Sequence, residues 1–170
     1  MKIQDIRIQS ITNHDLVHFN DVWTAKTKDK EYDIRLSEHF LLSEFIKTSY
    51  YQFNNGIPSA TVFHNICMGV KFILQPLRDK LGKPIIITSG YRSPIVNSCV
   101  GGKPGSQHRY GQAADIKVDP LYYRRLTEII RNLPYDQILT NERSKWLHVS
   151  WTSQDYCAGG RKQYITDYYN

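Results

Sequence analysis

The chain has 170 residues and a formal net charge of +6, from 22 Lys and Arg against 16 Asp and Glu. This length suits a single domain with its own hydrophobic core, and an aromatic content of 12% argues against an intrinsically disordered chain. The longest uninterrupted apolar runs are a few residues, so no membrane-spanning helix is predicted.

The basic balance is compatible with an anionic partner such as nucleic acid, a membrane surface or a cell wall. The Lys and Arg residues are scattered along the chain without a cluster, so nucleic-acid binding is not expected. The three cysteines, Cys67, Cys99 and Cys157, form no Cys-x-x-Cys pair. Neither a disulfide framework nor a thiolate zinc site is therefore predicted.

Residues 1–35 are weakly patterned and are predicted to form an N-terminal extension to a domain of residues 36–170. Residues 1–7 lack the continuous apolar run of a secretory signal peptide, so none is expected. After residue 36, Ser43 is predicted to cap a short helix that runs to Lys47, since Glu44 lies in its first turn.

The strongest helix signal comes next, from apolar residues that recur at steps of three and four. They are Val62, Ile66, Val70, Ile73, Leu74, Leu77 and Leu81. Ser59 or Thr61 can cap the start of this helix, and Gly82 stands where a helix-ending glycine belongs. Pro76 is expected to bend or disrupt its last turns.

The second half of the chain mixes strands and helices without a regular βαβ alternation, which predicts an α+β fold with a small, partly antiparallel sheet flanked by helices. The expected elements are a buried strand over 84–88, a helix over 94–99 capped by Ser93, a long loop over 101–113, a strand over 114–118, a helix over 120–132, and a hairpin of strands 137–141 and 146–151.

Three polar residues in this half could bind one metal ion, namely His108, Asp115 and His148. Zinc accepts imidazole nitrogen and carboxylate oxygen, and a catalytic site has three protein ligands and a water molecule. His108 and Asp115 cannot share an ion from a single helix, because two helical turns would separate them by about 10 Å. A loop made possible by Gly105 and Gly111 could fold His108 back beside a strand that carries Asp115.

The surrounding residues resemble the zinc D-alanyl-D-alanine peptidase family, which includes phage endolysins and shares its fold with the hedgehog signalling domain. The resemblance covers about residues 36 to 151 and rests on several blocks in order. They are Leu36-Ser37-x-His39-Phe40, Ser43-Glu44-Phe45, Leu74-Gln75-Pro76-Leu77-Arg78, Ser89-Gly90-Tyr91-Arg92-Ser93-Pro94, Asn97, Val100-Gly101-Gly102, Ser106-x-His108-x-x-Gly111-x-Ala113-Ala114-Asp115 and Trp146-x-His148-Val149-Ser150.

The resemblance implies that His108, Asp115 and His148 bind Zn²⁺, and that Arg92 contacts the substrate carbonyl and stabilises the developing oxyanion. It also implies that Ser106 lies beside the site and holds substrate or a ligand. Tyr91 and Trp146 could form walls of the cleft, although aromatic packing in the core explains them equally well.

The general base is where the chain departs from the family pattern. Many members have Glu three residues before the last histidine, where this chain has Lys145; another branch has it six residues before, which here is Glu142. A three-residue turn would pair Glu142 with Trp146 and place its carboxylate on the face of His148. A two- or four-residue turn would place Asn141 there instead. Because only a carboxylate can accept the water proton, Glu142 is the predicted base.

The resemblance thus predicts a zinc peptidase that hydrolyses peptidoglycan stem or cross-link peptides, as a carboxypeptidase or an endopeptidase. The sequence leaves the oligomeric state open, with a monomer as the default. A phage-type lysin, cytoplasmic until its release to the cell wall, would fit the lack of a signal peptide. The main alternative is a catalytically silent hedgehog-like zinc-binding module used in cell-wall binding or assembly. A nucleic-acid binder without metal is the third interpretation.

Overall fold

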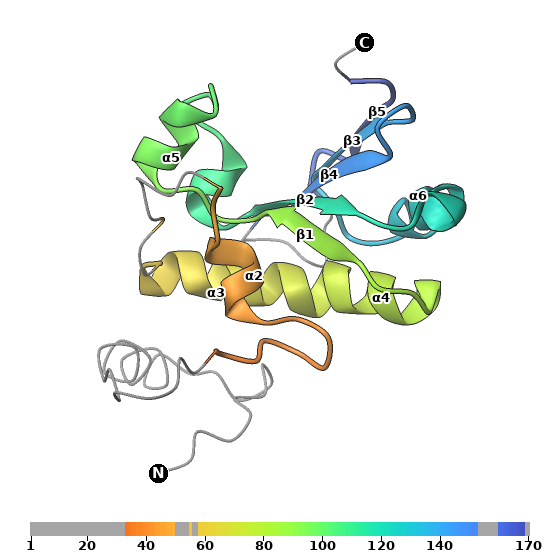
Figure 1. Ribbon diagram of the computed structural model, residues 1–170, viewed down its shortest axis with the longest axis horizontal. Coiled ribbons are helices and arrows are strands. Elements are labelled where there is room, and N and C mark those ends of the chain that lie inside the picture. The colour runs from red at the N-terminus through yellow and green to blue at the C-terminus, as the bar shows by residue number, and fades with distance from the viewer. Residues whose placement is uncertain (1–32, 50–54, 56–57, 153–159, 169–170) are drawn as a thin grey trace.

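The computed structural model describes residues 33–49, 55, 58–152 and 160–168, so the expected extension of residues 1–35 lies almost wholly outside it. The described residues form an α+β domain with a five-stranded mixed sheet, as predicted (Figure 1). In sheet order β1-β2-β4-β3-β5, every neighbouring pair is antiparallel except β3 with β5. The strands are β1 (Ile86–Ser89), β2 (Ala113–Lys117), β3 (Gln137–Asn141), β4 (Trp146–Ser150) and β5 (Gln163–Ile165).

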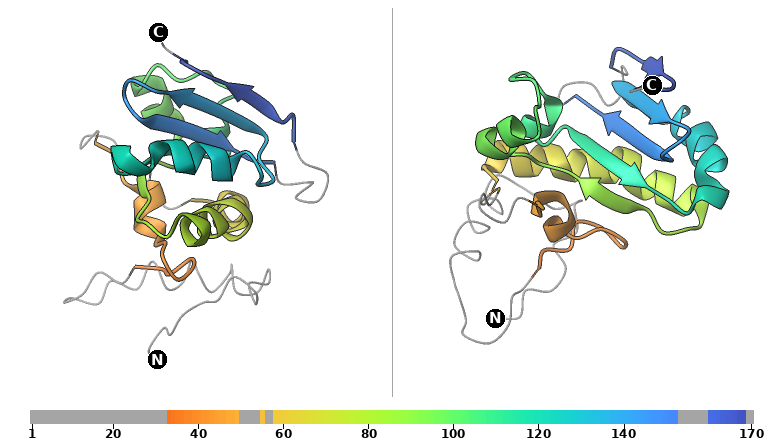
Figure 2. Two further views of the ribbon diagram at one scale, coloured as in Figure 1. Left: turned by 90° about the vertical axis from the view of Figure 1, so that its right-hand side faces the viewer. Right: turned by 45° about the horizontal axis from the view of Figure 1, so that its top comes forward.

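One long helical rod crosses a face of the sheet (Figures 1 and 2). It consists of α3 (Ala60–Gly69), the π-helical segment η2 (Val70–Leu74) and α4 (Gln75–Leu81). Ser59 caps its start by accepting a hydrogen bond from the Val62 N–H, and Gly82 ends it in the left-handed conformation with φ +67°. Both terminal residues were expected from the sequence.

The expected disruption near Pro76 takes the form of a π-helical turn. The Gln75 N–H donates to the carbonyl of Val70, five residues back. Proline has no N–H to donate, so the hydrogen-bond pattern must change where it enters a helix. Just before this turn, Gly69 lies against the indole of Trp151, and an added Cβ would stand 2.2 Å from that ring. The rod and the strand end are therefore in direct backbone-to-ring contact.

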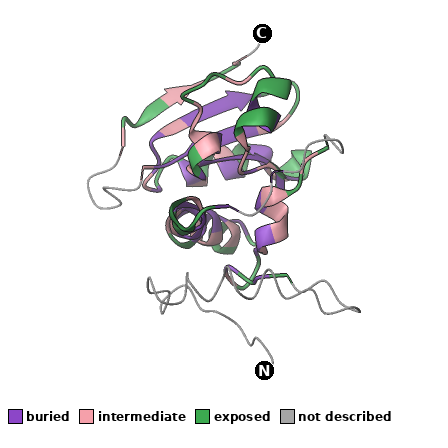
Figure 3. Ribbon diagram, turned by 90° about the vertical axis from the view of Figure 1, so that its left-hand side faces the viewer, coloured by how far each residue is buried: buried purple, intermediate pink, exposed green. Residues whose placement is uncertain are grey.

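The hydrophobic core fills the space between the sheet and the helical rod (Figure 3). Ile116, Leu147 and Val149 point into it and have no exposed surface. The alternate residues of the same strands point to the other face, which is open at the β1 edge, where Ile86 is 57% exposed. The strand predicted as buried over 84–88 forms as the edge strand β1, in which Ile87 is buried at 1% exposure but Ile86 faces outward.

The remaining helical segments are α2 (Leu42–Ile46), α5 (Pro94–Cys99), η3 (Gln107–Tyr110), η4 (Pro120–Tyr122) and α6 (Tyr123–Ile130). Ser93 caps α5 as predicted, accepting from the Val96 N–H. Ser43 does not cap α2; its hydroxyl contacts Asp33, and Glu44 accepts from the Leu41 N–H instead. The 3-10 helix η3 inside the expected loop and the strand β5 were not predicted.

Among the described residues, none of the helices combines the length and the apolar character needed to span a lipid bilayer.

Candidate metal centre

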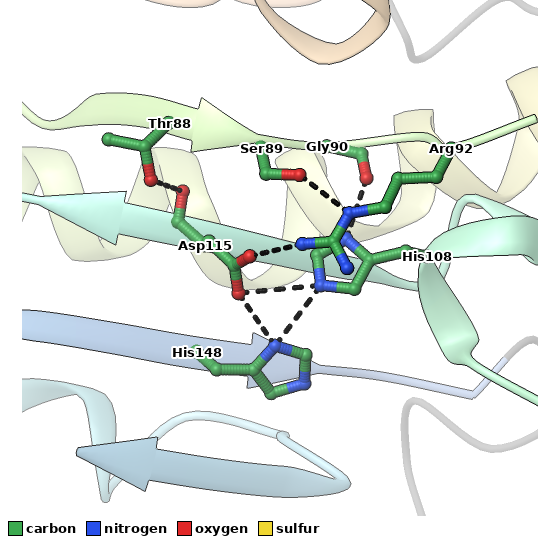
Figure 4. A network of polar contacts seen from close by, with 7 residues as sticks. All are labelled: Thr88, Ser89, Gly90, Arg92, His108, Asp115 and His148. Carbon is green, nitrogen blue, oxygen red and sulfur yellow. Dashed lines mark hydrogen bonds and ion pairs between the residues drawn. The ribbon is translucent and has the colours of Figure 1, made fainter. Parts of the chain in front are cut away.

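Three elements bring His108, Asp115 and His148 together on the face of the sheet opposite the helical rod (Figure 4). His108 comes from η3, Asp115 from β2 and His148 from β4. Asp115 and His148 stand directly opposite each other in the antiparallel pair of β2 with β4, so their side chains share one face. All three residues are buried, at 3%, 6% and 9% exposure.

Gly111 lets the chain return from η3 to β2. It ends the 3-10 helix in the left-handed conformation with φ +66°, and an added Cβ would stand 2.6 Å from the carbonyl oxygen of Val62. After this turn, the Gln112 N–H donates to the Gln107 carbonyl. The loop predicted from the glycines therefore exists, and the 3-10 helix within it aims His108 at the strand.

A backbone carbonyl fixes the tautomer of His108. The ring Nδ1 lies 2.6 Å from the Gly90 oxygen, which can only accept, so Nδ1 carries the proton. In the neutral ring, Nε2 then has a free lone pair, and this atom faces the other two residues. A metal-bound histidine characteristically donates its second N–H to such an oxygen, which orients the ring.

The distances among the three donor atoms suit a single ion. His108 Nε2 is 3.3 Å from Asp115 Oδ1 and 3.3 Å from His148 Nδ1, and His148 Nδ1 is 2.9 Å from Asp115 Oδ1. Tetrahedral coordination with bonds of about 2.0–2.1 Å sets its ligand atoms about 3.3 Å apart. The residues present therefore fit a tetrahedral metal ion with nitrogen and oxygen ligands.

The protonation states also suit metal binding. Burial acts to raise the pKa of Asp115, but its contacts with the imidazole rings of His108 and His148 outweigh burial and hold the pKa well below the ordinary value. Burial lowers the pKa of His148, and the contact with Asp115 only partly offsets this. An ionised carboxylate and neutral imidazole are the forms that metal ions bind.

Arg92 holds the carboxylate oxygen that faces away from the histidines. Its Nη2 lies 2.6 Å from Asp115 Oδ2, and its Nε donates to Ser89 Oγ at 2.8 Å (Figure 4). The Arg92 backbone N–H also donates to the His108 carbonyl at 3.1 Å. Arg92 thus contacts two of the three candidate ligand residues, a link that the sequence had not indicated.

Of the three expected substrate-contacting residues, Trp146 lies on the same strand as the candidate ligand His148. It begins β4 on the face of His148, and the two ring centroids are 6.2 Å apart. Ser106 directly precedes η3, where its carbonyl accepts from the Arg109 N–H. Tyr91 is half-buried between β1 and α5, packs against the core and has its pKa raised by burial.

The hairpin register expected for Glu142 is wrong. Asn141 pairs with Trp146, so residues 142–145 form a four-residue turn. Asn141 accepts from the Ser144 N–H at 2.9 Å, a turn-stabilising contact typical of asparagine. Lys145 closes the turn with φ +52°.

Two consequences follow for the side chains of the turn. Asn141 shares the face of Trp146, but it donates to the Tyr168 carbonyl at 2.9 Å rather than reaching the cluster. The Glu142 carboxylate is 61% exposed and pairs with Lys145 Nζ at 2.7 Å. In the described part of the chain, no hydrogen bond or ion pair joins Glu142 to the three clustered residues.

Two residues that support the cluster were not predicted to do so. Thr88 donates from Oγ1 to the Asp115 carbonyl at 3.1 Å, and Gly90 supplies the oxygen that orients His108. Both lie in or beside the Ser89-to-Pro94 block, whose density of small and polar residues was the available signal.

Comparison with known proteins adds two findings. The family model of peptidase M15 matches residues 38–150 of this chain. The zinc D-Ala-D-Ala carboxypeptidase of Streptomyces albus G is 40% identical to it over 67 residues, which is 39% of this chain and 26% of that relative. The chain thus matches about a quarter of the length of this curated relative.

Proposed function

Because the chain belongs to the peptidase M15 family, we propose that it is a zinc peptidase that hydrolyses amide bonds in peptidoglycan peptides. The observation that carries the proposal is the buried cluster of His108, Asp115 and His148, whose donor atoms converge at distances that suit one ion. The similarity to the Streptomyces zinc carboxypeptidase supports both the metal and the substrate class.

His108 Nε2, His148 Nδ1 and Asp115 Oδ1 would hold the ion. When bound, a zinc ion supplies Lewis acidity that activates water and polarises an amide carbonyl. The protein prepares this site by keeping the Asp115 carboxylate ionised and the histidine ring of η3 oriented. Gly90 fixes His108, and Arg92 with Ser89 fixes the Asp115 carboxylate.

Arg92 is the proposed oxyanion-stabilising residue. Its guanidinium is 17% exposed and is held beside Asp115, so a positive charge is already oriented at the edge of the cluster. Preorganised charge of this kind stabilises negative charge that develops on a carbonyl oxygen during attack. Ser106, Tyr91 and Trp146 are the proposed substrate-contacting residues, since Trp146 extends the face of His148 and the other two flank the segments that carry Arg92 and His108.

The net charge supports a cell-wall substrate. A chain with a charge of +6 is attracted to the anionic polymers of a bacterial wall, which raises its local concentration there.

Zinc analysis and product identification test the proposal together. Purified protein is expected to bind one zinc per chain and to release peptide fragments from peptidoglycan, detected by mass spectrometry. Released D-alanine would identify a carboxypeptidase, and separated cross-linked stems an endopeptidase. His148→Ala is expected to lose both zinc and cleavage, whereas wild-type protein that binds no zinc would overturn the proposal.

One observation favours a second candidate, a zinc-binding module without turnover. The Glu142 carboxylate lies away from the cluster and pairs with Lys145, although peptide hydrolysis requires a group that accepts the water proton. Wild-type protein that binds zinc and peptidoglycan but leaves stems of varied composition uncut would establish this candidate instead.

A further inference from the structure

The side chain of Gln107, the residue directly before the candidate ligand His108, is engaged at both ends. Its Nε2 donates to Asp136 Oδ2 at 3.0 Å and to the Trp151 carbonyl at 3.1 Å. Its Oε1 accepts from Arg161 Nη2 at 3.1 Å. The amide therefore ties η3 to the end of β4 and to the chain after residue 160.

Asp136 is the centre of this network. It is 3% exposed, and Arg161 binds it through the backbone N–H at 2.8 Å and through Nη2 at 2.7 Å. The Arg161 Nε lies 3.1 Å from both carboxylate oxygens. A buried carboxylate with several charge-assisted hydrogen bonds is a rigid anchor.

Arg161 belongs to the segment 160–168, which lies beyond the part of the chain that matches the family model. This segment is fixed independently of Arg161. Its strand β5 pairs with β3, the Lys162 Nζ donates to the Leu133 carbonyl at 2.8 Å, and the Tyr168 N–H donates to the Thr140 carbonyl. Arg161 therefore contacts Gln107 from a segment that is itself anchored to the sheet.

We propose that Arg161, Asp136 and Gln107 are positioning residues that hold η3, and with it His108, in place for the metal ion. This inference rests on the proposed zinc site. His108 is the candidate ligand that comes from a short 3-10 helix rather than from the sheet, so its position depends on what fixes that helix. Residues that orient metal ligands from outside the coordination sphere commonly change metal affinity by about 10- to 100-fold when mutated.

The test compares Arg161→Ala with Lys162→Ala in the full chain. Both substitutions remove one cation and one side-chain anchor from the same segment, but the Lys162 Nζ donates to the Leu133 carbonyl, whereas Arg161 donates to Gln107 in η3. The readout is the rate of zinc transfer to a chromophoric chelator. We expect Arg161→Ala to release zinc about tenfold faster than wild type, and Lys162→Ala to release it at the wild-type rate.

Two further variants separate positioning from general stability. Arg161→Lys keeps the charge beside Asp136 and should restore most of the slow release. Gln107→Glu keeps the length of the side chain but replaces the donor that faces Asp136 with a second carboxylate, and should release zinc at least as fast as Arg161→Ala. Circular dichroism and urea unfolding of the metal-free variants verify that each protein is folded.

The outcomes are distinct from those for the proposed function. Wild-type protein without zinc would remove the zinc site itself. Wild-type protein that holds zinc, with Arg161→Ala releasing it no faster than Lys162→Ala, would overturn the positioning role alone. If Lys162→Ala released zinc as fast as Arg161→Ala, the positioning role would also be overturned, because any loosening of segment 160–168 would then speed zinc release.

Discussion

Arg92 and Asp115 form a largely buried ion pair in which Nη2 lies 2.6 Å from Oδ2, while the second carboxylate oxygen, Oδ1, faces the two histidines. One carboxylate thus serves two purposes, because each of its oxygens has a different partner. The arrangement predicts that Arg92 matters to the protein before any substrate binds.

Arg92→Ala should destabilise the metal-free protein. The substitution leaves Asp115 Oδ2 buried without its cation, and removing one partner of a buried pair costs about 3 kcal/mol. Urea unfolding in the presence of a chelator measures this loss. The control is Arg124→Ala, because Arg124 is 91% exposed and its pair with Glu128 is a surface contact, for which a change within about 0.5 kcal/mol is expected. Equal effects of the two substitutions would contradict the structural importance of the Arg92 pair.

Zinc content should depend on each clustered residue. His108→Ala and His148→Ala each remove one donor atom, and Asp115→Asn removes the negative charge of the carboxylate ligand. Each substitution should lower the zinc bound per chain from about one to well below one after dialysis. His64→Ala is the matched control, since His64 is an exposed histidine on α3. Inductively coupled plasma mass spectrometry gives the content. Full zinc retention in His108→Ala would count against the whole centre.

Gly111→Ala should weaken zinc binding as well as stability. The alanine backbone would have to keep the left-handed conformation of Gly111, and the new methyl group would lie 2.6 Å from the Val62 carbonyl oxygen. Gly101 has a similar φ of +69° but nothing within 4 Å of an added Cβ. Gly101→Ala should therefore cost only the conformational strain, about 1–2 kcal/mol, and leave zinc affinity unchanged. Urea unfolding measures the loss of stability in each variant, and chelator competition measures zinc affinity. A loss of zinc affinity in Gly111→Ala alone would indicate displacement of η3 rather than backbone strain.

The loss of folding stability at acid pH should depend on the ionisation of Asp136. Burial acts to raise the pKa of its carboxyl, but hydrogen bonds from Arg161 and Gln107 outweigh burial and hold the pKa below its ordinary value of 3.8. Between the lowered folded-state pKa and the ordinary value of 3.8, the unfolded chain therefore binds more protons than the folded protein. The stabilisation is fully present above about pH 4 and is lost as the pH falls through the lowered folded-state pKa. Arg161→Ala removes the main cause of the lowering.

The predicted result is that acid unfolding of Arg161→Ala begins at higher pH than that of wild type. Tryptophan fluorescence followed from pH 7 to pH 2 in metal-free protein measures the transition. Lys162→Ala again serves as the control. If Arg161→Ala lost the same amount of stability at every pH, Arg161 would not be what lowers the pKa of Asp136.

Glu142→Gln is expected to leave zinc binding unchanged and peptide cleavage within a few-fold of wild type. The reason is geometric, since the carboxylate is exposed and pairs with Lys145 rather than with the cluster. General-base residues typically contribute about 100- to 10,000-fold to rate. A loss of that size in Glu142→Gln, with zinc retained, would contradict this expectation and restore Glu142 as the base.

Much of the fold follows from local chemistry in the sequence. The caps Ser59, Ser93 and Gly82 act as predicted because each forms its contacts with residues a few positions away. The candidate ligand set was predicted mainly from the resemblance of several ordered sequence blocks to the zinc peptidase family, and the structure brings these three residues together.

Most of the errors concern strand register and contacts that the local sequence does not specify. The turn after Asn141 could not be counted from the sequence, because two-, three- and four-residue turns were all compatible with it, and one residue of register decides which face Glu142 occupies. Strand β5 has only three residues, Gln163–Ile165, and forms because β3 offers it a free edge. The network of Gln107 with Arg161 joins residues 54 positions apart and left no local pattern.

The contact of Gly69 with Trp151 has a consequence for how this chain can vary. Trp151 lies three residues after His148, the last candidate ligand. Its indole packs on the helix backbone at Gly69 and donates from Nε1 to the Asn65 carbonyl at 2.8 Å. A bulkier side chain at position 69 would be tolerated only with a smaller one at position 151. Among related proteins these two positions should therefore change together, and a variant library that randomises both should recover functional pairs that neither single substitution allows.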